Sequence, residues 1–213
     1  MLKFIYGTMG SSKTAQALIL AHDIRTRMHR RVYLLKPSVD TRSPRIESRL
    51  GISADCLTFT PTDNVLDIIF AHGDTDLSTP VSAKVAVIID EAQFCTPTQI
   101  EQLREFSTCD LADVFCFGLK TTYKAELFPG SRRLLELADS IEEIPSLCSC
   151  GAPATQNALF LNDTLQTTGP DTIIGDTEYR PLCYNCYKAA LADAARGGNT
   201  PHGRKRNPGK PRV

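Results

Sequence analysis

The chain has 213 residues, enough for one substantial hydrophobic core with a small second domain beside it. Its 24 basic side chains balance 24 acidic ones, but five bases and no acid lie in residues 197–213, so the rest carries an excess of five acids. This distribution argues against a nucleic-acid groove over the folded body. No apolar run approaches the roughly 18 residues of a membrane span, and the start of the chain lacks the features of a signal peptide, which predicts a cytoplasmic protein.

Apolar periodicity predicts alternating strands and helices along the first 140 residues. In chain order, we expect a strand over 3–6, a helix over 13–29, a strand over 31–36, a helix over 62–72, a strand over 84–90, a helix over 96–107, a strand over 113–119 and a helix over 131–140. Residues 37–62 are expected to form a long loop. Because the strands are apolar throughout, the pattern predicts an α/β fold with a parallel sheet and helices on both faces. Ligands then gather at the carboxyl ends of the strands.

A glycine-rich loop, GTMGSSKT (7–14), separates the first expected strand from the first expected helix. In this context the loop amides and the helix N-terminus face a nucleotide's phosphates, Lys13 reaches the β- and γ-phosphates, and the Thr14 hydroxyl binds Mg²⁺. Ser12 replaces the pattern's second glycine, at a cost of about 1–2 kcal/mol for its dihedral angles. A plain Gly/Ser turn is the alternative. The residues expected to bind the cofactor here are Gly7, Thr8, Met9, Gly10, Ser11, Ser12, Lys13 and Thr14.

The run VIIDEAQF (87–94) ends an apolar strand in two acids. Asp90, at the strand end, is expected in the magnesium shell opposite the phosphate loop. Glu91 lies one residue further out, where a carboxylate can take a proton from an attacking hydroxyl or water. The alternative for Glu91 is a solvated loop acid. We count Gln93 of the same run with the cofactor-binding residues.

Four of the eight cysteines form two close pairs, CSCG (148–151) and CYNC (183–186). Four thiolates in this spacing match a tetrahedral structural Zn²⁺ site with ligands Cys148, Cys150, Cys183 and Cys186. Four free thiols are the alternative. Because zinc stabilises a domain too small to hold itself together, we expect a nucleotide-binding domain at 1–145, a zinc-binding domain at 146–192 and a disordered basic tail at 193–213.

A loop, VDTRSPRIESRLG (39–51), follows the second expected strand. Its residues of interest are Asp40, Arg42, Arg45 and Arg49. Arginine next to a transferring phosphoryl group stabilises its developing charge. A solvated basic loop is the alternative, and we prefer it for Arg45 and Arg49.

Two later segments contain aromatic residues whose roles stay open. The loop 118–131 contains Tyr123 and Phe128, which either sandwich a planar base or anchor the loop to the core. Between the cysteine pairs, the Gly175-Asp176 turn and Tyr179 either close over a ligand or belong to a surface hairpin.

Taken in chain order, these motifs resemble one family. They are G-x-M in the first loop, D-x-R after the second strand, DE-x-QF, GL-x-T-x-Y-x-x-x-x-F over 118–128, and two cysteine pairs that bracket IG-x-x-x-Y. Over residues 1–188 the chain resembles the cellular-type (type II) thymidine kinases.

The resemblance implies a RecA-like P-loop domain with a zinc-binding lasso domain. It implies transfer of the γ-phosphate of ATP to the 5′-hydroxyl of thymidine or deoxyuridine, in pyrimidine deoxynucleotide salvage. Glu91 is then the base, Lys13 and Arg42 are also catalytic, and Asp90 with Thr14 serves Mg²⁺. The implied nucleoside-binding residues are Met9, Asp40, Leu119, Tyr123, Phe128, Ile173, Ile174, Gly175, Asp176 and Tyr179. Family members are usually homotetramers that thymidine triphosphate inhibits.

Two positions depart from the family pattern. Ser12 replaces the loop glycine, and Gln156 is a bulky polar residue near the position that faces the thymine 5-substituent. Two other functions compete. DEAQ (90–93) is similar to a helicase box, which suggests a nucleic-acid-dependent ATPase, although the chain has room for one motor domain. Ser12 also fits a zinc-bearing binding protein whose loop no longer turns over nucleotide.

Overall fold

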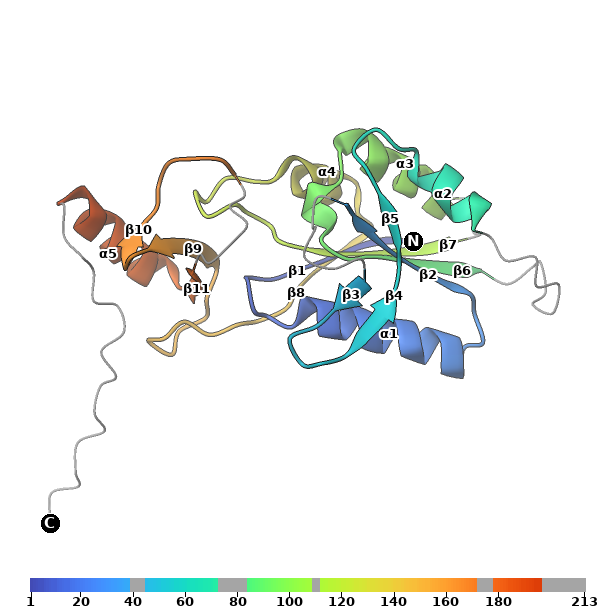
Figure 1. The fold of residues 1–213 in the computed structure, drawn as a ribbon, viewed down its shortest axis with the longest axis horizontal. Coiled ribbons are helices and arrows are strands. Elements are labelled where there is room, and N and C mark those ends of the chain that lie inside the picture. The colour runs from blue at the N-terminus through green and yellow to red at the C-terminus, as the bar shows by residue number, and fades with distance from the viewer. Residues whose placement is uncertain (39–44, 73–83, 109–111, 172–177, 197–213) are drawn as a thin grey trace, which may run out of the picture.

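A six-stranded parallel sheet with helices on both faces forms the larger part of the computed structural model (Figure 1). The structure describes residues 1–38, 45–72, 84–108, 112–171 and 178–196. The sheet has the strand order β5-β2-β6-β7-β1-β8, and each neighbouring pair is parallel. Its strands are β1 (Leu2–Tyr6), β2 (Val32–Pro37), β5 (Leu57–Phe59), β6 (Val85–Ile89), β7 (Ala112–Gly118) and β8 (Ser140–Glu143). This is the expected RecA-like α/β fold.

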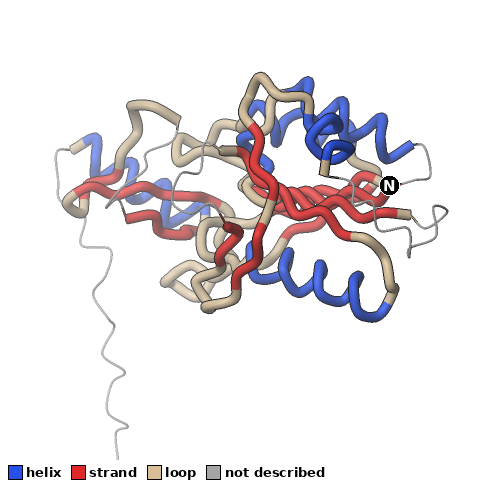
Figure 2. Tube along the Cα trace, turned by 45° about the vertical axis from the view of Figure 1, so that its right-hand side comes forward, coloured by secondary structure: helices blue, strands red, loops and turns tan. Residues whose placement is uncertain are grey.

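Within the described residues, four helices cover the two faces of this sheet. Helix α1 (Lys13–Arg27) lies on one face, and α2 (Val65–Ala71), α3 (Pro97–Thr108) and α4 (Pro129–Leu137) lie on the other (Figures 1 and 2). Successive residues of a strand point to opposite faces, so Phe4 packs in the cluster under α2, α3 and α4, and Ile5 packs in the cluster under α1. The continuous apolar runs of the sequence therefore supply both hydrophobic layers.

The expected elements of the first 140 residues are present, with two errors. The expected loop at 37–62 is wrong, because it contains β5 and the antiparallel hairpin of β3 (Arg45–Glu47) and β4 (Ser53–Asp55). The last expected helix is too long, since α4 ends at Leu137 and the edge strand β8 follows it. A short 3₁₀ helix, Ala92–Phe94, follows β6.

A second, smaller sheet lies beyond the end of β1 (Figure 1). It is antiparallel, with the order β10-β9-β11, and consists of β9 (Gln156–Leu161), β10 (Thr164–Leu165) and β11 (Glu178–Leu182). Helix α5 (Tyr184–Ala195), which the sequence reading did not expect, packs on it through Tyr187 and Ala190. We call residues 146–196 the cysteine module; the domain boundaries themselves stay a prediction.

None of the helices in the described part of the chain combines the length and the apolar character that a membrane span requires.

Candidate active site

The phosphate loop connects the end of β1 to the start of α1. The Lys13 Nζ atom donates hydrogen bonds to the carbonyl oxygens of Thr8, at 2.8 Å, and Gly7, at 3.3 Å. Lys13 is buried, and burial lowers the pKa of its ammonium, although the charges of Glu91 and Asp90 act in the opposite direction. The loop thus wraps around a buried cation, the lysine that in a phosphate-binding loop reaches the β- and γ-phosphates.

Ser12 adopts the left-handed conformation, with φ 64° and ψ 24°. The expectation that this position needs dihedral angles unfavourable for a side chain is confirmed. The Ser12 carbonyl oxygen still accepts the Gln16 N–H at 3.0 Å, so α1 begins normally. Ser12 therefore strains the backbone, and the loop leads directly into α1.

Thr14 and Asp90 meet across the carboxyl end of the sheet. The Thr14 hydroxyl donates a hydrogen bond to Asp90 Oδ2 at 3.0 Å. Burial, and then the neighbouring charge of Glu91, raises the pKa of Asp90 to about 7, although the hydrogen bond from Thr14 opposes the shift. A buried carboxylate beside a hydroxyl, both near a phosphate loop, is the kind of oxygen donor set that suits Mg²⁺.

Glu91 occupies a strained position directly after β6. Its φ of 55° and ψ of 37° are left-handed values, which a non-glycine residue adopts at a cost and which are often found at functional sites. Gln93 fixes the carboxylate, because its Nε2 donates a hydrogen bond to Glu91 Oε2. The other end of the Gln93 amide accepts the Leu119 N–H at 3.0 Å.

Gly118 makes this arrangement sterically feasible. A Cβ atom at position 118 would lie 2.7 Å from the Gln93 Oε1 atom, closer than a real contact allows. The end of β7 therefore approaches the Gln93 amide through a glycine. Both ends of that amide are engaged within the protein, and the assignment of Gln93 to cofactor binding stays a prediction.

A cleft of about 490 Å³ opens in front of these groups. The phosphate loop and the end of β6 line one part, and the β3–β4 hairpin lines another. The lining residues are Met9, Gly10, Ser12, Lys13, Thr14, Ala15, Lys36, Arg45, Ile46, Glu47, Ser48, Arg49, Leu50, Asp90 and Glu91.

Three cations line the cleft that the sequence analysis did not assign to the site: Arg45 and Arg49 from the hairpin, and Lys36 from β2. Arg45 and Arg49 are exposed, as a solvated loop would have them, but both face the cleft. Lys36 is buried at the end of β2, and its Nζ atom donates a hydrogen bond to the Arg45 carbonyl oxygen at 3.1 Å. Short strands with charged residues gave no periodic signal for this hairpin.

The aromatic loop after β7 is tied to its surroundings on two sides. Tyr123 is buried, and its hydroxyl lies 3.0 Å from the Thr168 carbonyl oxygen and 2.9 Å from that of Pro170. The Phe128 ring packs edge-on against Phe94 with centroids 5.8 Å apart. These contacts favour the anchoring alternative for both rings, and their role in base binding stays a prediction.

The remaining candidate residues lie around the cleft or outside the described part of the chain. Leu119 is buried at the end of β7, and Tyr179 is half-buried in β11, where it pairs with Leu159. The candidates outside the described residues are Asp40, Arg42, Ile173, Ile174, Gly175 and Asp176.

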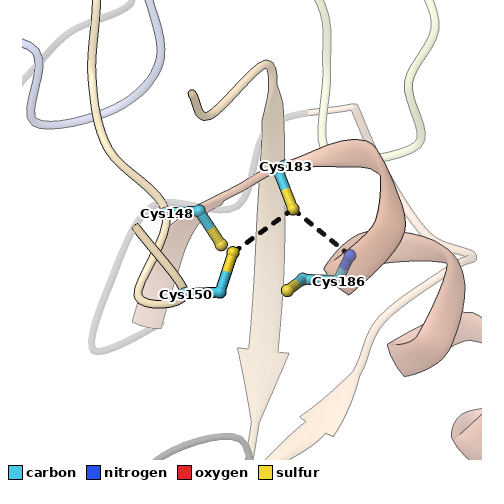
Figure 3. Close-up of side chains that lie close together, drawn as sticks. All are labelled: Cys148, Cys150, Cys183 and Cys186. Atoms are coloured by element: carbon cyan, nitrogen blue, oxygen red, sulfur yellow. Dashed lines mark hydrogen bonds between the residues drawn. The ribbon is translucent and has the colours of Figure 1, made fainter. Parts of the chain in front are cut away.

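The four paired cysteines converge in space. Their sulfur atoms lie within 4.8 Å of one another, and Figure 3 shows the side chains of Cys148, Cys150, Cys183 and Cys186 turned toward a common point. Tetrahedral zinc with Zn–S bonds of about 2.3 Å requires sulfur atoms roughly 3.8 Å apart, and the Cys150 and Cys183 sulfurs are 3.6 Å apart. The cluster can therefore hold zinc.

The local backbone prepares this cluster for a metal. Cys183 caps α5, and its Sγ atom accepts the Cys186 N–H at 3.5 Å. Burial acts to raise the pKa of Cys148, but hydrogen bonds from the backbone of Cys150 and Cys183 and from neighbouring thiols lower it to about 6. The thiolate is the form that binds zinc.

One residue of the site carries no sequence signal. Asn157 in β9 contacts the phosphate loop, since its Oδ1 atom accepts the Met9 N–H at 2.8 Å. The neighbouring Gln156, which the resemblance places near the thymine 5-substituent, instead directs its amide to the Thr155 hydroxyl at 3.4 Å. A single asparagine in a short strand matches no motif, so only the tertiary structure reveals it.

Comparison with known proteins identifies similar sequences over most of the chain. A family model described as thymidine kinase matches residues 1–187. The thymidine kinase of Chromobacterium violaceum is 37% identical over 192 residues, which cover 87% of this chain and 97% of that protein. That of Ruegeria pomeroyi is 35% identical, with 93% and 98% covered. That of Enterobacteria phage T4 is 33% identical, with 85% and 92% covered.

Proposed function

The chain belongs to the thymidine kinase family and is a kinase that phosphorylates thymidine, and we propose that its own residues carry out the reaction at the cleft between the phosphate loop and the β3–β4 hairpin. One observation supports this site above the others. The buried Lys13 ammonium, the Thr14–Asp90 pair and the clamped Glu91 carboxylate all line this cleft at the carboxyl end of the sheet.

The proposed reaction is transfer of the γ-phosphoryl group of ATP to the 5′-hydroxyl of thymidine. The phosphate loop and Lys13 hold the β- and γ-phosphates, and Arg45 and Arg49 on the hairpin face the same space. The Glu91 carboxylate takes the proton of the 5′-hydroxyl as its oxygen bonds to the γ-phosphorus. The bond from that phosphorus to the bridging oxygen breaks, which gives thymidine monophosphate and ADP.

Thr14 and Asp90 are the residues that would hold Mg²⁺. A magnesium ion neutralises charge on the phosphates during transfer. The Asp90 carboxylate is buried and next to Glu91, so a cation at this place would relieve the cost of keeping both acids ionised. Arg42, outside the described residues, stays a predicted catalytic residue.

Zinc at the four cysteines is proposed as a structural ion. It would cross-link the two segments that flank the small sheet, since Cys148 and Cys150 precede β9 and Cys183 and Cys186 follow β11. Deoxyuridine as a second acceptor, a homotetrameric state, inhibition by thymidine triphosphate and a cytoplasmic location rest on the sequence reading and stay predictions.

The test uses ATP labelled on its γ-phosphate, with thymidine, deoxyuridine, deoxycytidine or no acceptor in parallel. We expect label on thymidine and on deoxyuridine, and none on deoxycytidine. A Ser12→Gly variant is assayed beside the natural chain. Label transfer by the variant alone would show that strain in the phosphate loop, and not a wrong assignment of function, limits the natural chain. No labelled nucleoside from either protein would overturn the proposal, and ATP hydrolysis stimulated by nucleic acid would favour the helicase-like alternative.

A further inference from the structure

Asn157 connects three segments that are far apart in the sequence. It lies in β9 of the cysteine module and is buried. Its Oδ1 atom accepts the Met9 N–H of the phosphate loop at 2.8 Å. Its Nδ2 atom donates to the Thr121 carbonyl oxygen, in the loop after β7, at 3.0 Å. One side-chain amide thus joins the phosphate loop, the aromatic loop and the cysteine module.

The chemistry of these partners fixes the orientation of the amide. Met9 offers an N–H donor and Thr121 offers a carbonyl acceptor, so the Asn157 oxygen must face the first and its nitrogen the second. Loss of this side chain would remove the protein partner of two partly buried backbone groups, and an unsatisfied group costs about 1–3 kcal/mol when it is fully buried. The Met9 segment of the loop therefore depends on Asn157 for its position.

A second contact joins the same two parts of the molecule. The hydroxyls of Thr8 and Ser146 are hydrogen-bonded to each other. Thr8 and Met9 are consecutive in the phosphate loop, and Ser146 lies two residues before Cys148. The carbonyl oxygens of Thr8 and Gly7 in turn accept hydrogen bonds from the Lys13 ammonium. A displacement of Thr8 and Met9 would therefore reach the Lys13 side chain.

The four cysteines flank the small sheet that contains Asn157. In the small sheet Asn157 pairs with Pro181 of β11, and Leu182, the next residue, leads directly into Cys183. Cys148 precedes the same sheet and belongs to the same hydrophobic cluster as Leu182 and Cys183. The four thiols lie close together, so a metal that they bind would join the segment before β9 to the segment after β11, on either side of Asn157.

We propose that Asn157 is a positioning residue for phosphoryl transfer, through which the cysteine module holds the phosphate loop in its productive geometry. The inference rests on the proposed function of the cleft. Asn157 acts through the Met9 backbone and the Thr121 carbonyl. Its loss should therefore change the loop and the transfer rate even when the module stays folded with its metal.

The first test observes the Met9 amide directly. The chain has three methionines, and Met1 carries the terminal ammonium, so isotope labelling of methionine nitrogens reports the amides of Met9 and Met28. Met28 donates to the Ile24 carbonyl oxygen at the end of α1 and serves as the internal reference. In Asn157→Ala we expect hydrogen exchange at Met9 to be at least about 5-fold faster, because one hydrogen bond is lost, with Met28 unchanged.

The second test measures kinetics on the same zinc-loaded proteins. We expect Asn157→Ala to lower kcat/KM for MgATP by about 10-fold or more, since two hydrogen bonds are lost. The matched control is Gln166→Ala, whose side-chain amide also lies in the module but donates to Thr164 within it, at 3.0 Å. The control should keep the natural kinetics. Zinc content and melting temperature show which variants are folded.

The outcomes separate three readings. Slower transfer and faster Met9 exchange, with zinc retained, support the proposal. Natural kinetics with unchanged exchange in a folded Asn157→Ala variant would overturn it, and so would a change confined to the ratio of thymidine to deoxyuridine phosphorylation. If Asn157→Ala does not fold, Ser146→Ala removes the second contact and gives the same readouts. Thymidine phosphorylation by the natural chain, measured in parallel, distinguishes failure of this inference from failure of the proposed function.

Discussion

The two sheets of this molecule are stabilised in different ways. The six-stranded sheet buries apolar residues on both faces, in two separate clusters. The small sheet has one cluster, and two candidate metal ligands, Cys148 and Cys183, belong to it. Apolar burial can stabilise the first, whereas we expect the second, which has a single cluster, to need a metal cross-link. The small sheet nevertheless contacts the phosphate loop through Asn157, so we infer that a metal at the four cysteines would affect catalysis although they lie outside the cleft.

The largest effect should come from removing a thiol. We expect Cys183→Ser to lose zinc and to unfold the cysteine module, because apparent zinc-binding energies of about 10–16 kcal/mol hold small domains of this kind together. Metal content by emission spectroscopy and protease sensitivity of residues 146–196 measure the effect. Cys56→Ser, which changes a half-buried thiol outside the cluster, should keep the metal. A Cys183→Ser protein with full zinc and a protected module would contradict this account.

A core substitution in the large sheet should have the next largest effect. Phe4 is fully buried in β1, and Phe4→Ala should lower the free energy of unfolding of this domain by about 3–5 kcal/mol. Zinc should stay bound, because the cysteine module has its own cluster. Denaturant unfolding followed together with zinc release tests both statements. Ile19→Ala, at an exposed position of α1, is the control and should change stability by less than about 0.5 kcal/mol.

A smaller effect should follow from the clamp on Glu91. Gln93 lies in the large domain and holds the Glu91 carboxylate by a hydrogen bond. Asn157, which lies in the cysteine module, holds the Met9 N–H in a similar way. Gln93→Leu removes the donor to the carboxylate, and we expect kcat to fall about 10-fold, the equivalent of one such hydrogen bond. Gln99→Leu is the matched control, because Gln99 is equally buried but caps α3 away from the cleft. It should lower stability and leave kcat unchanged; equal kcat values for the two variants would disprove the clamp.

The smallest effect concerns an ion pair that holds the edge of the large sheet. The Arg104 guanidinium, and next the Leu2 N–H, lower the pKa of Asp139 below its ordinary value of 3.8. The folded state therefore favours the ionised form, and this stabilisation is present above pH 3.8 and disappears as the pH falls through the lowered pKa. At neutral pH, Asp139→Asn should cost under about 1 kcal/mol, since the pair is partly exposed. Urea unfolding at several pH values should show the difference shrinking toward acid; a constant difference would refute this assignment.

The same contrast explains what the sequence could predict. Long apolar strands such as β6 and β7 carry their own signal. The motifs after β1 and β6 predicted Lys13, Asp90 and Glu91 as site residues, and all three line the cleft. The hairpin at 45–55 was missed because its strands are three residues long and rich in charge. Helix α5 was missed because it begins inside the second cysteine pair, at Tyr184. That pair suggested only a metal-binding loop. Asn157 matters through two tertiary contacts, and no local pattern encodes such contacts.

We propose that Glu91 is the base for phosphoryl transfer to thymidine in this cleft. The most direct measurement is the single-turnover rate of label transfer from γ-labelled ATP to thymidine by Glu91→Gln, compared with the natural chain. Glutamine keeps the shape of the side chain and an oxygen for the Gln93 amide, but it cannot accept the 5′-hydroxyl proton. We predict a rate at least about 100-fold lower, with zinc content and nucleotide binding unchanged. A near-normal transfer rate in that variant would contradict the claim.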